Sequence, residues 1–175
     1  MVTTNVNAYK CAQTDFGYDE SAADSSGVTV QHVAAPNSVR GNLTSVKQQL
    51  FTSPCTTATP SMTPLTTTKH VFDTGMLHTS TDPNSNMTTY AYSGSFYGAF
   101  VTQTTMPSTS SPNAASHAVS GNYDFNTGLL TSFTDQNSNV TSFIYDVMLR
   151  PTNATYPSPT EVKRISTIRI RRLLK

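Results

Sequence analysis

The chain has 175 residues, enough for one ordinary domain, but only 12% of them are charged, against ~25% in typical globular proteins. Its 21 Ser and 30 Thr fill the gap; Thr, Tyr and Phe favour strands, whereas Ser and Asn favour turns. The formal net charge of +1 argues against a charge-driven disordered chain, so the composition leaves an all-β fold or a Ser/Thr-rich stalk.

The N-terminal flank, residues 1–15, carries no visible targeting signal. Met1–Asn5 lacks the basic region and the apolar run of a signal peptide, and no segment approaches the ~18 apolar residues of a membrane span. Either the chain is cytoplasmic or it is a fragment whose export signal lies elsewhere. Cys11 and Cys55 are too few for a disulfide-rich scaffold and lack zinc-site spacing, so one bridge and two free thiols both stay open.

Residues 16–157 contain a repeat that becomes clearer along the chain. Arg40–Val46 reads RGNLTSV, and Thr127–Phe133 reads TGLLTSF. Phe72–Tyr92 and Phe125–Tyr145 agree at eleven of 21 positions without a gap, at an offset of 53 residues, which chance does not produce. We expect copies near 16–50, 72–107 and 123–157, between the flank 1–15 and a basic tail at 158–175.

Each of the two clear copies predicts a β-hairpin. A Gly opens the copy, a short strand leads to Thr-Asp, and Asp-x-Asn-Ser-Asn forms the turn, because Asn and Asp side chains bond the nearby backbone and tolerate left-handed φ. An isolated hairpin is barely stable, so the face that is preserved between copies is expected to pack on neighbouring copies.

The strand register follows if the loops have four residues, Pro83–Asn86 and Gln136–Asn139. In the later copy this register places Leu130 opposite Tyr145, Ser132 opposite Phe143 and Thr134 opposite Thr141, and in the earlier copy it places Leu77 opposite Tyr92. Cross-strand pairs of this kind contribute about 0.2–1 kcal/mol each.

These residues resemble the unit of the RHS/YD-repeat proteins, which is similar to Tyr-Asp, Gly, a strand, Thr-Asp, a turn, a strand and a closing Tyr-Asp. Residues 123–146 match that unit closely, and the resemblance covers most of residues 16–157. Ser85, Ser138 and Leu149 stand where the family commonly has Gly, and Ser93 replaces the Asp after Tyr92. The repeat positions that we expect to carry the structure are Gly41, Gly75, Gly128, Leu77, Leu130, Asp82, Asp135, Asn86, Asn139, Tyr92, Tyr123, Asp124, Tyr145 and Asp146.

The resemblance implies a structural role. Proteins of this family build long antiparallel sheets that spiral into hollow shells around a toxic domain, and related cell-surface proteins use them for adhesion or carbohydrate contact. We therefore expect an all-β fold of antiparallel β-hairpins in an open, twisted sheet, serving as the scaffold or encapsulating shell of a secreted or surface toxin protein. Expected partners are neighbouring repeats of a longer chain or toxin cargo; the alternative is a cell-surface module that binds glycans through exposed Tyr and Asn.

No catalytic residue, metal site or cofactor is predicted. The turns at Asp82 and Asp135 begin like a D-x-N-x-N calcium loop, but Met87 and Val140 occupy its Gly position and the flanks are strand-like, so Asx-rich turns are the preferred interpretation. His78 is replaced by Thr131 in the later copy and is expected to be a surface or packing residue.

The tail is basic, with six of the eleven Lys and Arg residues in the last fourteen positions, whereas residues 1–161 hold five basic against ten acidic residues. Such a tail could contact nucleic acid, anionic lipid or an acidic partner. Because it has neither a strand nor a helix period, a solvated end is the preferred interpretation, and no nucleic-acid partner is expected.

Overall fold

The computed structural model describes residues 11–30, 39–51, 63–109, 117–157 and 165–167. In this part of the chain the paired strands are antiparallel and the only helix is a single short 3-10 turn, which confirms the predicted all-β class. The chain divides into two compact units, residues 1–26 with 32–87 and residues 27–31 with 88–175. The division of the sequence into three copies and two flanks stays a prediction.

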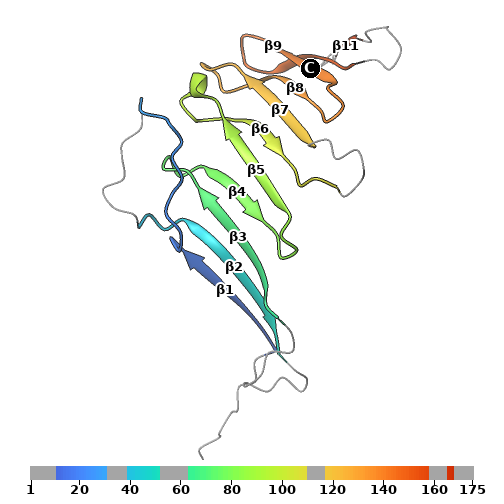
Figure 1. Ribbon diagram of the computed structural model, residues 1–175. Coiled ribbons are helices and arrows are strands. Elements are labelled where there is room, and N and C mark those ends of the chain that lie inside the picture. The colour runs from blue at the N-terminus through green and yellow to red at the C-terminus, as the bar shows by residue number, and fades with distance from the viewer. Residues whose placement is uncertain (1–10, 31–38, 52–62, 110–116, 158–164, 168–175) are drawn as a thin grey trace, which may run out of the picture. The chain divides into compact units, whose positions relative to one another are not determined.

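The first unit is an open sheet in which each strand pairs with the next one along the chain (Figure 1). Its strands are β1 (Ala12–Tyr18), β2 (Leu43–Leu50), β3 (Leu65–Val71) and β4 (Leu77–Thr81). The sequence of β3, LTTTKHV, shows why a strand forms here, since β-branched Thr and Val fit a pleated surface.

The second unit repeats this sequential pairing. Its strands are β5 (Met87–Tyr92, of which Met87 belongs to the first unit), β6 (Val101–Thr105), β7 (Ala118–Tyr123), β8 (Leu130–Thr134), β9 (Val140–Tyr145), β10 (Pro151–Thr155) and β11 (Ile165–Thr167). The 3-10 turn Gly94–Phe96 lies between β5 and β6, and the hydroxyl of Ser93 caps it by accepting the Ser95 N–H at 3.1 Å.

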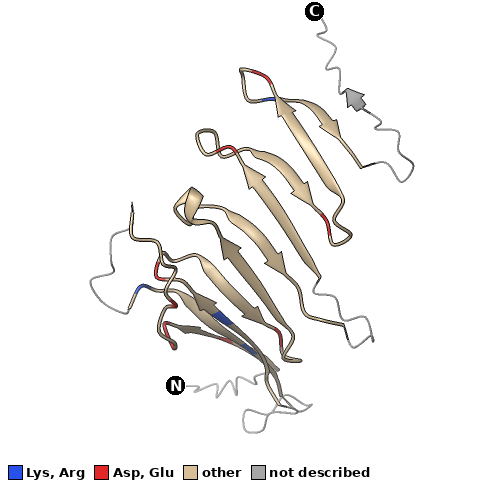
Figure 2. Ribbon diagram, turned by 45° about the horizontal axis from the view of Figure 1, so that its top comes forward, with Lys and Arg blue, Asp and Glu red and all other residues tan. Residues whose placement is uncertain are grey.

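The described residues have almost no enclosed core. Ala154 is the only buried hydrophobic residue among them, and the two buried polar residues are Thr44 and Ser45. Most Asp and Glu positions fall in turns and at strand ends, and the ribbon between them is largely uncharged (Figure 2). A sheet with so thin a core depends on its cross-strand pairs and its turns for stability.

The predicted register of the β8–β9 hairpin is wrong by one residue. Thr134 pairs with Val140, not Thr141, and Ser132 pairs with Ser142, not Phe143. The Asp135 N–H donates to the Asn139 carbonyl at 2.9 Å, and the Ser138 N–H donates to the Asp135 carbonyl at 3.0 Å. The loop between the Asp135–Asn139 pair therefore has three residues and ends on Ser138 in the left-handed conformation (φ 63°), a common hairpin loop that sequence alone does not distinguish from a four-residue one.

A β-bulge in the β7–β8 pair changes which side chains share a face of the sheet. Tyr123 of β7 pairs with Leu130 of β8, while Asn122 pairs with Ser132, so Thr131 is the extra residue. Two residues opposite one shift the alternation of side chains. As a consequence Leu130 and Tyr145 share a face, as predicted, and Phe133 lies on it with them. Ser132 and Thr134, which were expected opposite Phe143 and Thr141, lie on the other face.

The sequence left open whether the two cysteines are bridged or free. Cys11, directly before β1, is disulfide-bonded, whereas Cys55 lies outside the described residues.

Of the basic tail 158–175, only the short strand β11 is described. None of the helical structure in the described ranges is long and apolar enough to cross a bilayer.

Candidate functional site

The two Asp-x-Asn-Ser-Asn turns have the same hydrogen bonds. Asp135 Oδ1 accepts the N–H groups of Asn137 and Asn139 at 2.8 and 2.9 Å, and its Oδ2 accepts the Asn139 side-chain amide at 3.0 Å. Asp82 makes the corresponding bonds to Asn84 and Asn86 at 2.8, 2.9 and 2.9 Å. Each carboxylate is thus committed to closing its own turn.

These bonds change the acidity of both carboxyl groups. The side-chain amide of Asn139, followed by the Asn139 backbone N–H, lowers the pKa of Asp135, because both donors favour the charged carboxylate. Asn86 lowers the pKa of Asp82 in the same order of causes. The hydrogen bonds within each turn therefore stabilise the ionised carboxylate, as expected of a residue that caps a turn.

The Tyr-Asp pairs at the opposite strand ends also close turns. Asp124 Oδ1 accepts the N–H and the hydroxyl of Thr127 at 2.9 and 2.8 Å. Asp146 accepts the N–H groups of Met148 and Arg150 at 2.8 and 3.0 Å and pairs with the Arg150 guanidinium. The side-chain bonds from Thr127 and Arg150 are the first causes that lower the pKa of Asp124 and Asp146, respectively.

Asp19 closes a longer connection in the first unit. Its carboxylate accepts the backbone N–H groups of Arg40, Gly41 and Asn42 at 2.9, 2.6 and 3.0 Å. The Gly41 N–H is the largest cause that lowers the pKa of Asp19. The three expected repeat glycines all lie in the left-handed region, where glycine is favoured. The φ angles are 77° for Gly41, 83° for Gly75 and 71° for Gly128.

Five strand pairs contain a β-bulge, and in each of them the extra residue is the second residue of its strand. These residues are Thr44, His78, Thr102, Thr131 and Thr152. Each threonine hydroxyl donates to a carbonyl across the pair, to Gly17, Ala91, Asn122 and Ile144 respectively, at 3.1–3.2 Å. Thr44 and Thr131 share the sequence Leu-Thr-Ser, but the bulge at these positions was not predicted from it.

Two repeat tyrosines bridge to the neighbouring strand beside these bulges. The Tyr145 hydroxyl donates to the Leu130 carbonyl at 2.8 Å, and the Tyr123 hydroxyl donates to the Val101 carbonyl at 3.1 Å. Leu130 and Val101 each directly precede a bulge threonine. Tyrosine and threonine therefore form a recurring cross-strand unit in β6–β9 of the second unit.

Side chains on one face of the second unit form what we call the aromatic face. It comprises Tyr90, Tyr92, Val101, Val119, Tyr123, Leu130, Phe133, Phe143 and Tyr145, which the strand pairs and bulges direct to the same side. Burial raises the pKa of Tyr92, and the neighbouring Tyr90 adds to that shift. Phe133 is 36% exposed, whereas Ile144 on the opposite face is 56% exposed.

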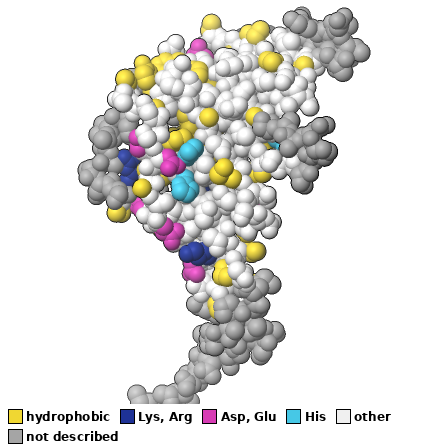
Figure 3. Space-filling model, in the orientation of Figure 1, with side chains coloured by type: hydrophobic (Ala, Val, Ile, Leu, Met, Phe, Trp, Pro, Cys, Tyr) yellow, Lys and Arg dark blue, Asp and Glu magenta, His cyan; other side chains and the backbone are white. Residues whose placement is uncertain are grey.

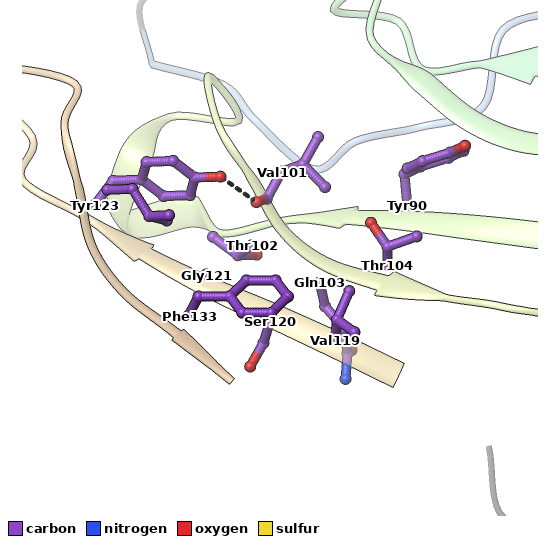
Figure 4. Close-up of a pocket in the computed structure, with 11 residues that line it drawn as sticks. Tyr90, Val101, Thr102, Gln103, Thr104, Val119, Ser120, Gly121, Tyr123 and Phe133 are labelled. Atoms are coloured by element: carbon purple, nitrogen blue, oxygen red, sulfur yellow. Dashed lines mark hydrogen bonds between the residues drawn. The ribbon is translucent and has the colours of Figure 1, made fainter. Parts of the chain in front are cut away.

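A shallow cavity of about 430 Å³ opens on the aromatic face (Figure 4). Figure 4 shows Tyr123 reaching toward Val101 above the Phe133 ring. Gly121 lies in the floor of the cavity, and a Cβ at that position would come within 3.0 Å of the Leu130 side chain. The described residues of the lining contribute aromatic rings, aliphatic side chains, hydroxyl groups, the Gln103 amide and backbone, and none of them is charged.

Five aromatic residues beside this cavity form a cluster that was not predicted from the sequence; one of them, Tyr97, meets the edge of Phe125 with ring centroids 5.5 Å apart. Phe100 stacks on Tyr123 with ring centroids 4.9 Å apart, and Phe96 meets the edge of Phe100 at 5.6 Å. Phe125 stacks on Phe96 at 6.5 Å. The signal in the sequence was the run of aromatic residues after Tyr92, where Ser93 stands in place of the repeat Asp.

Comparisons with known proteins indicate the fold. No protein-family model and no curated protein matches the sequence. Two solved structures share the fold over 71% of this chain at 17% identity: a TcdB2-TccC3 crystal structure without the hypervariable C-terminal region, with TM-score 0.55, and a Photorhabdus luminescens Tc holotoxin pore carrying a TccC3 mutation, with TM-score 0.54. The match covers 6% of each of those chains. The chain is therefore similar in fold to a small part of large toxin-complex proteins.

Proposed function

We propose that this chain is a non-catalytic, RHS/YD-type repeat segment that serves as scaffold or shell wall in a larger secreted or surface toxin protein. The observation that carries the proposal is the recurring unit of a bulge threonine, a bridging tyrosine and a capping aspartate, repeated along consecutive strands. The fold likeness to Tc toxin proteins and the small share of their length that it covers support a longer chain context.

The chemistry of the repeat carboxylates supports a structural role. The carboxylates of Asp82 in the first unit and Asp135 in the second unit bond the turns in which they lie. The described residues that line the cavity on the aromatic face include no charged side chain. General acid–base or nucleophilic chemistry needs a titratable group directed at a substrate.

The carbohydrate-binding alternative has less support from the geometry. The hydroxyls of Tyr123 and Tyr145 already donate to backbone carbonyls, whereas a sugar site would use such polar groups for orientation. Titration of the full chain with mono- and oligosaccharides, followed through the aromatic NMR signals, distinguishes the two functions. The scaffold proposal predicts no shift of the Tyr90 or Phe133 signals, and saturable shifts would favour the carbohydrate module.

Footprinting tests the scaffold proposal directly. In a longer protein that contains this chain, neighbouring elements should cover the aromatic face, so hydroxyl-radical labelling of Phe133 should fall at least severalfold relative to the 175-residue chain alone. Ile144, on the other face of the same hairpin, is the internal control. Equal labelling of Phe133 in both proteins, or flanking DNA without in-frame repeats on either side, would contradict the proposal.

A further inference from the structure

Asp24 and two histidines form a cluster in the first unit that the repeat does not explain. Asp24 Oδ2 lies 2.6 Å from His78 Nδ1 and 3.9 Å from His70 Nδ1. Figure 3 shows histidine side chains next to acidic side chains on the visible face. All three side chains are partly exposed, at 38% for Asp24, 31% for His78 and 49% for His70. Solvent protons therefore reach both imidazole rings.

The carboxylate belongs to a segment outside the strands, residues 20–26, that folds back on the end of β3. The Asp24 N–H donates to the Val71 carbonyl at 2.8 Å, and the Asp73 N–H donates to the Asp24 carbonyl at 2.8 Å. The Ser26 N–H donates to Asp73 Oδ1 at 3.1 Å. The segment is therefore bonded to the end of β3 and the following turn through Asp24 and Ser26. Its first residue, Glu20, donates its N–H to the Thr44 hydroxyl of β2 at 3.1 Å.

His78 occupies the bulge position that is threonine in the four other bulges of the described strands. Its ring stacks on Phe72 with centroids 4.2 Å apart and an interplanar angle of 27°. The stacking holds the ring with Nδ1 toward Asp24. The change from threonine thus replaces a local backbone contact with a contact to a distant segment.

We propose that Asp24, His70 and His78 form a pH-sensitive latch that holds residues 20–26 against β3 and β4 more tightly in mild acid. Histidine is the side chain whose charge ordinarily changes between pH 5 and 8. His78 donates Nδ1–H to the carboxylate, so an added proton enters at Nε2 and makes the ring a cation. Protonated His70 becomes a second cation beside the same oxygen. Because this attraction exists only when the segment is docked, acid favours docking.

The other charged groups around the latch ordinarily keep their charge over that range. The turn between β3 and β4 contributes Asp73, whose carbonyl accepts a bond from the Arg40 guanidinium. Lys69 precedes His70 in β3. At the start of the segment Glu20 pairs with Lys47 at 3.9 Å. A change in docking between pH 5.5 and 8 is therefore assigned to the histidines.

A metal ion does not account for the cluster. Within the described ranges no three His, Cys, Asp or Glu side chains are arranged to hold one. The 2.6 Å contact between Asp24 and His78 is a direct hydrogen bond, which leaves no room for an ion between the two atoms.

The test is amide exchange of Asp24 and Ser26 in the full chain, measured by NMR at pH 5.5 and 8.0 and divided by the intrinsic rate at each pH. Partly exposed ion pairs change an equilibrium by a few-fold, so we expect protection about two- to fivefold higher at pH 5.5. His78→Thr, which restores the residue found at the other bulges, should remove most of that ratio. Asp24→Asn, which keeps the size and an acceptor oxygen, should remove it as well.

His117→Thr is the matched control, because His117 lies in the second unit and contacts Gln136. It should leave the pH ratio at Asp24 unchanged. A wild-type ratio near one, or an equal ratio in His78→Thr and wild type, would overturn the latch. Protection that appears only when Zn²⁺ is added would also overturn it and assign the cluster to metal binding.

Discussion

The Tyr145 hydroxyl donates to the backbone carbonyl of Leu130 at 2.8 Å, across the β8–β9 hairpin and beside the Thr131 bulge. The same relationship joins Tyr123 to Val101 one hairpin earlier. A repeat tyrosine therefore contributes both a ring on the aromatic face and a polar bond that fixes where the neighbouring strand begins. Its energetic contribution can be measured separately from its packing.

Tyr145→Phe removes the hydroxyl and keeps the ring. We expect the free energy of unfolding to fall by about 0.5–1.5 kcal/mol, the usual net contribution of one hydrogen bond. Urea unfolding of the full chain measures the change. Tyr156→Phe is the control, since Tyr156 is 52% exposed and should change stability by less than about 0.5 kcal/mol. Equal effects of the two substitutions would contradict the role of the Tyr145 hydroxyl.

Thr131→Val keeps the shape of the bulge side chain but removes the donor to the Asn122 carbonyl. Because that carbonyl would lose a partner, we expect a loss of about 0.5–1.5 kcal/mol in unfolding free energy. Thr141→Val tests the same chemical change at a regular strand position opposite Phe133. It should be neutral or slightly stabilising, since Val fits a strand well. A loss at Thr141 as large as that at Thr131 would show that the bulge bond is unimportant.

Ser138→Gly should stabilise the second unit. Ser138 has φ 63°, and a side chain in the left-handed region costs roughly 1 kcal/mol that glycine does not. Thermal unfolding should show a corresponding rise in Tm. Asn137→Gly, one position earlier and outside that region, is expected to destabilise through added chain entropy. An increase in Tm for both variants would mean that left-handed backbone geometry is not the cause.

Asn139→Ala removes the donor that contributes most to the lowered pKa of Asp135. We expect the pKa of Asp135 to rise toward the ordinary value of about 3.9. In wild type the lowered pKa stabilises the fold above that value, and the stabilisation is lost as pH falls through the lower folded-state pKa. The variant should therefore lose less stability between pH 6 and pH 2.5.

Carboxyl-carbon NMR titration measures this effect at single residues. Asp82, in the matching turn of the first unit, is the internal control, and its pKa should stay lowered by Asn86 in the Asn139→Ala variant. If Asp135 titrates unchanged in the variant, the bond from the Asn139 amide is not what holds its carboxylate ionised.

The local chemistry of this chain determined which segments become strands and where they turn. Thr, Val and aromatic residues gave the strands, and the Asp-x-Asn-Ser-Asn segments gave turns because Asp82 and Asp135 satisfy backbone N–H groups within five residues of sequence. These interactions are short-range, so neighbouring residues in the sequence are enough to predict them. The repeat in the sequence likewise predicted that equivalent hairpins recur.

Tertiary structure alone decided which side chains share a face. The three-residue loop after Asp135 and the bulge at Thr131 each shift the alternation by one position, and together they put Phe133, in place of the expected Ser132, on the side of Leu130 and Tyr145. Loop length and bulges depend on backbone bonds across the pair, which residue order does not reveal. The contact of Asp24 with His78 depends in the same way on how a segment 54 residues distant folds back onto the sheet.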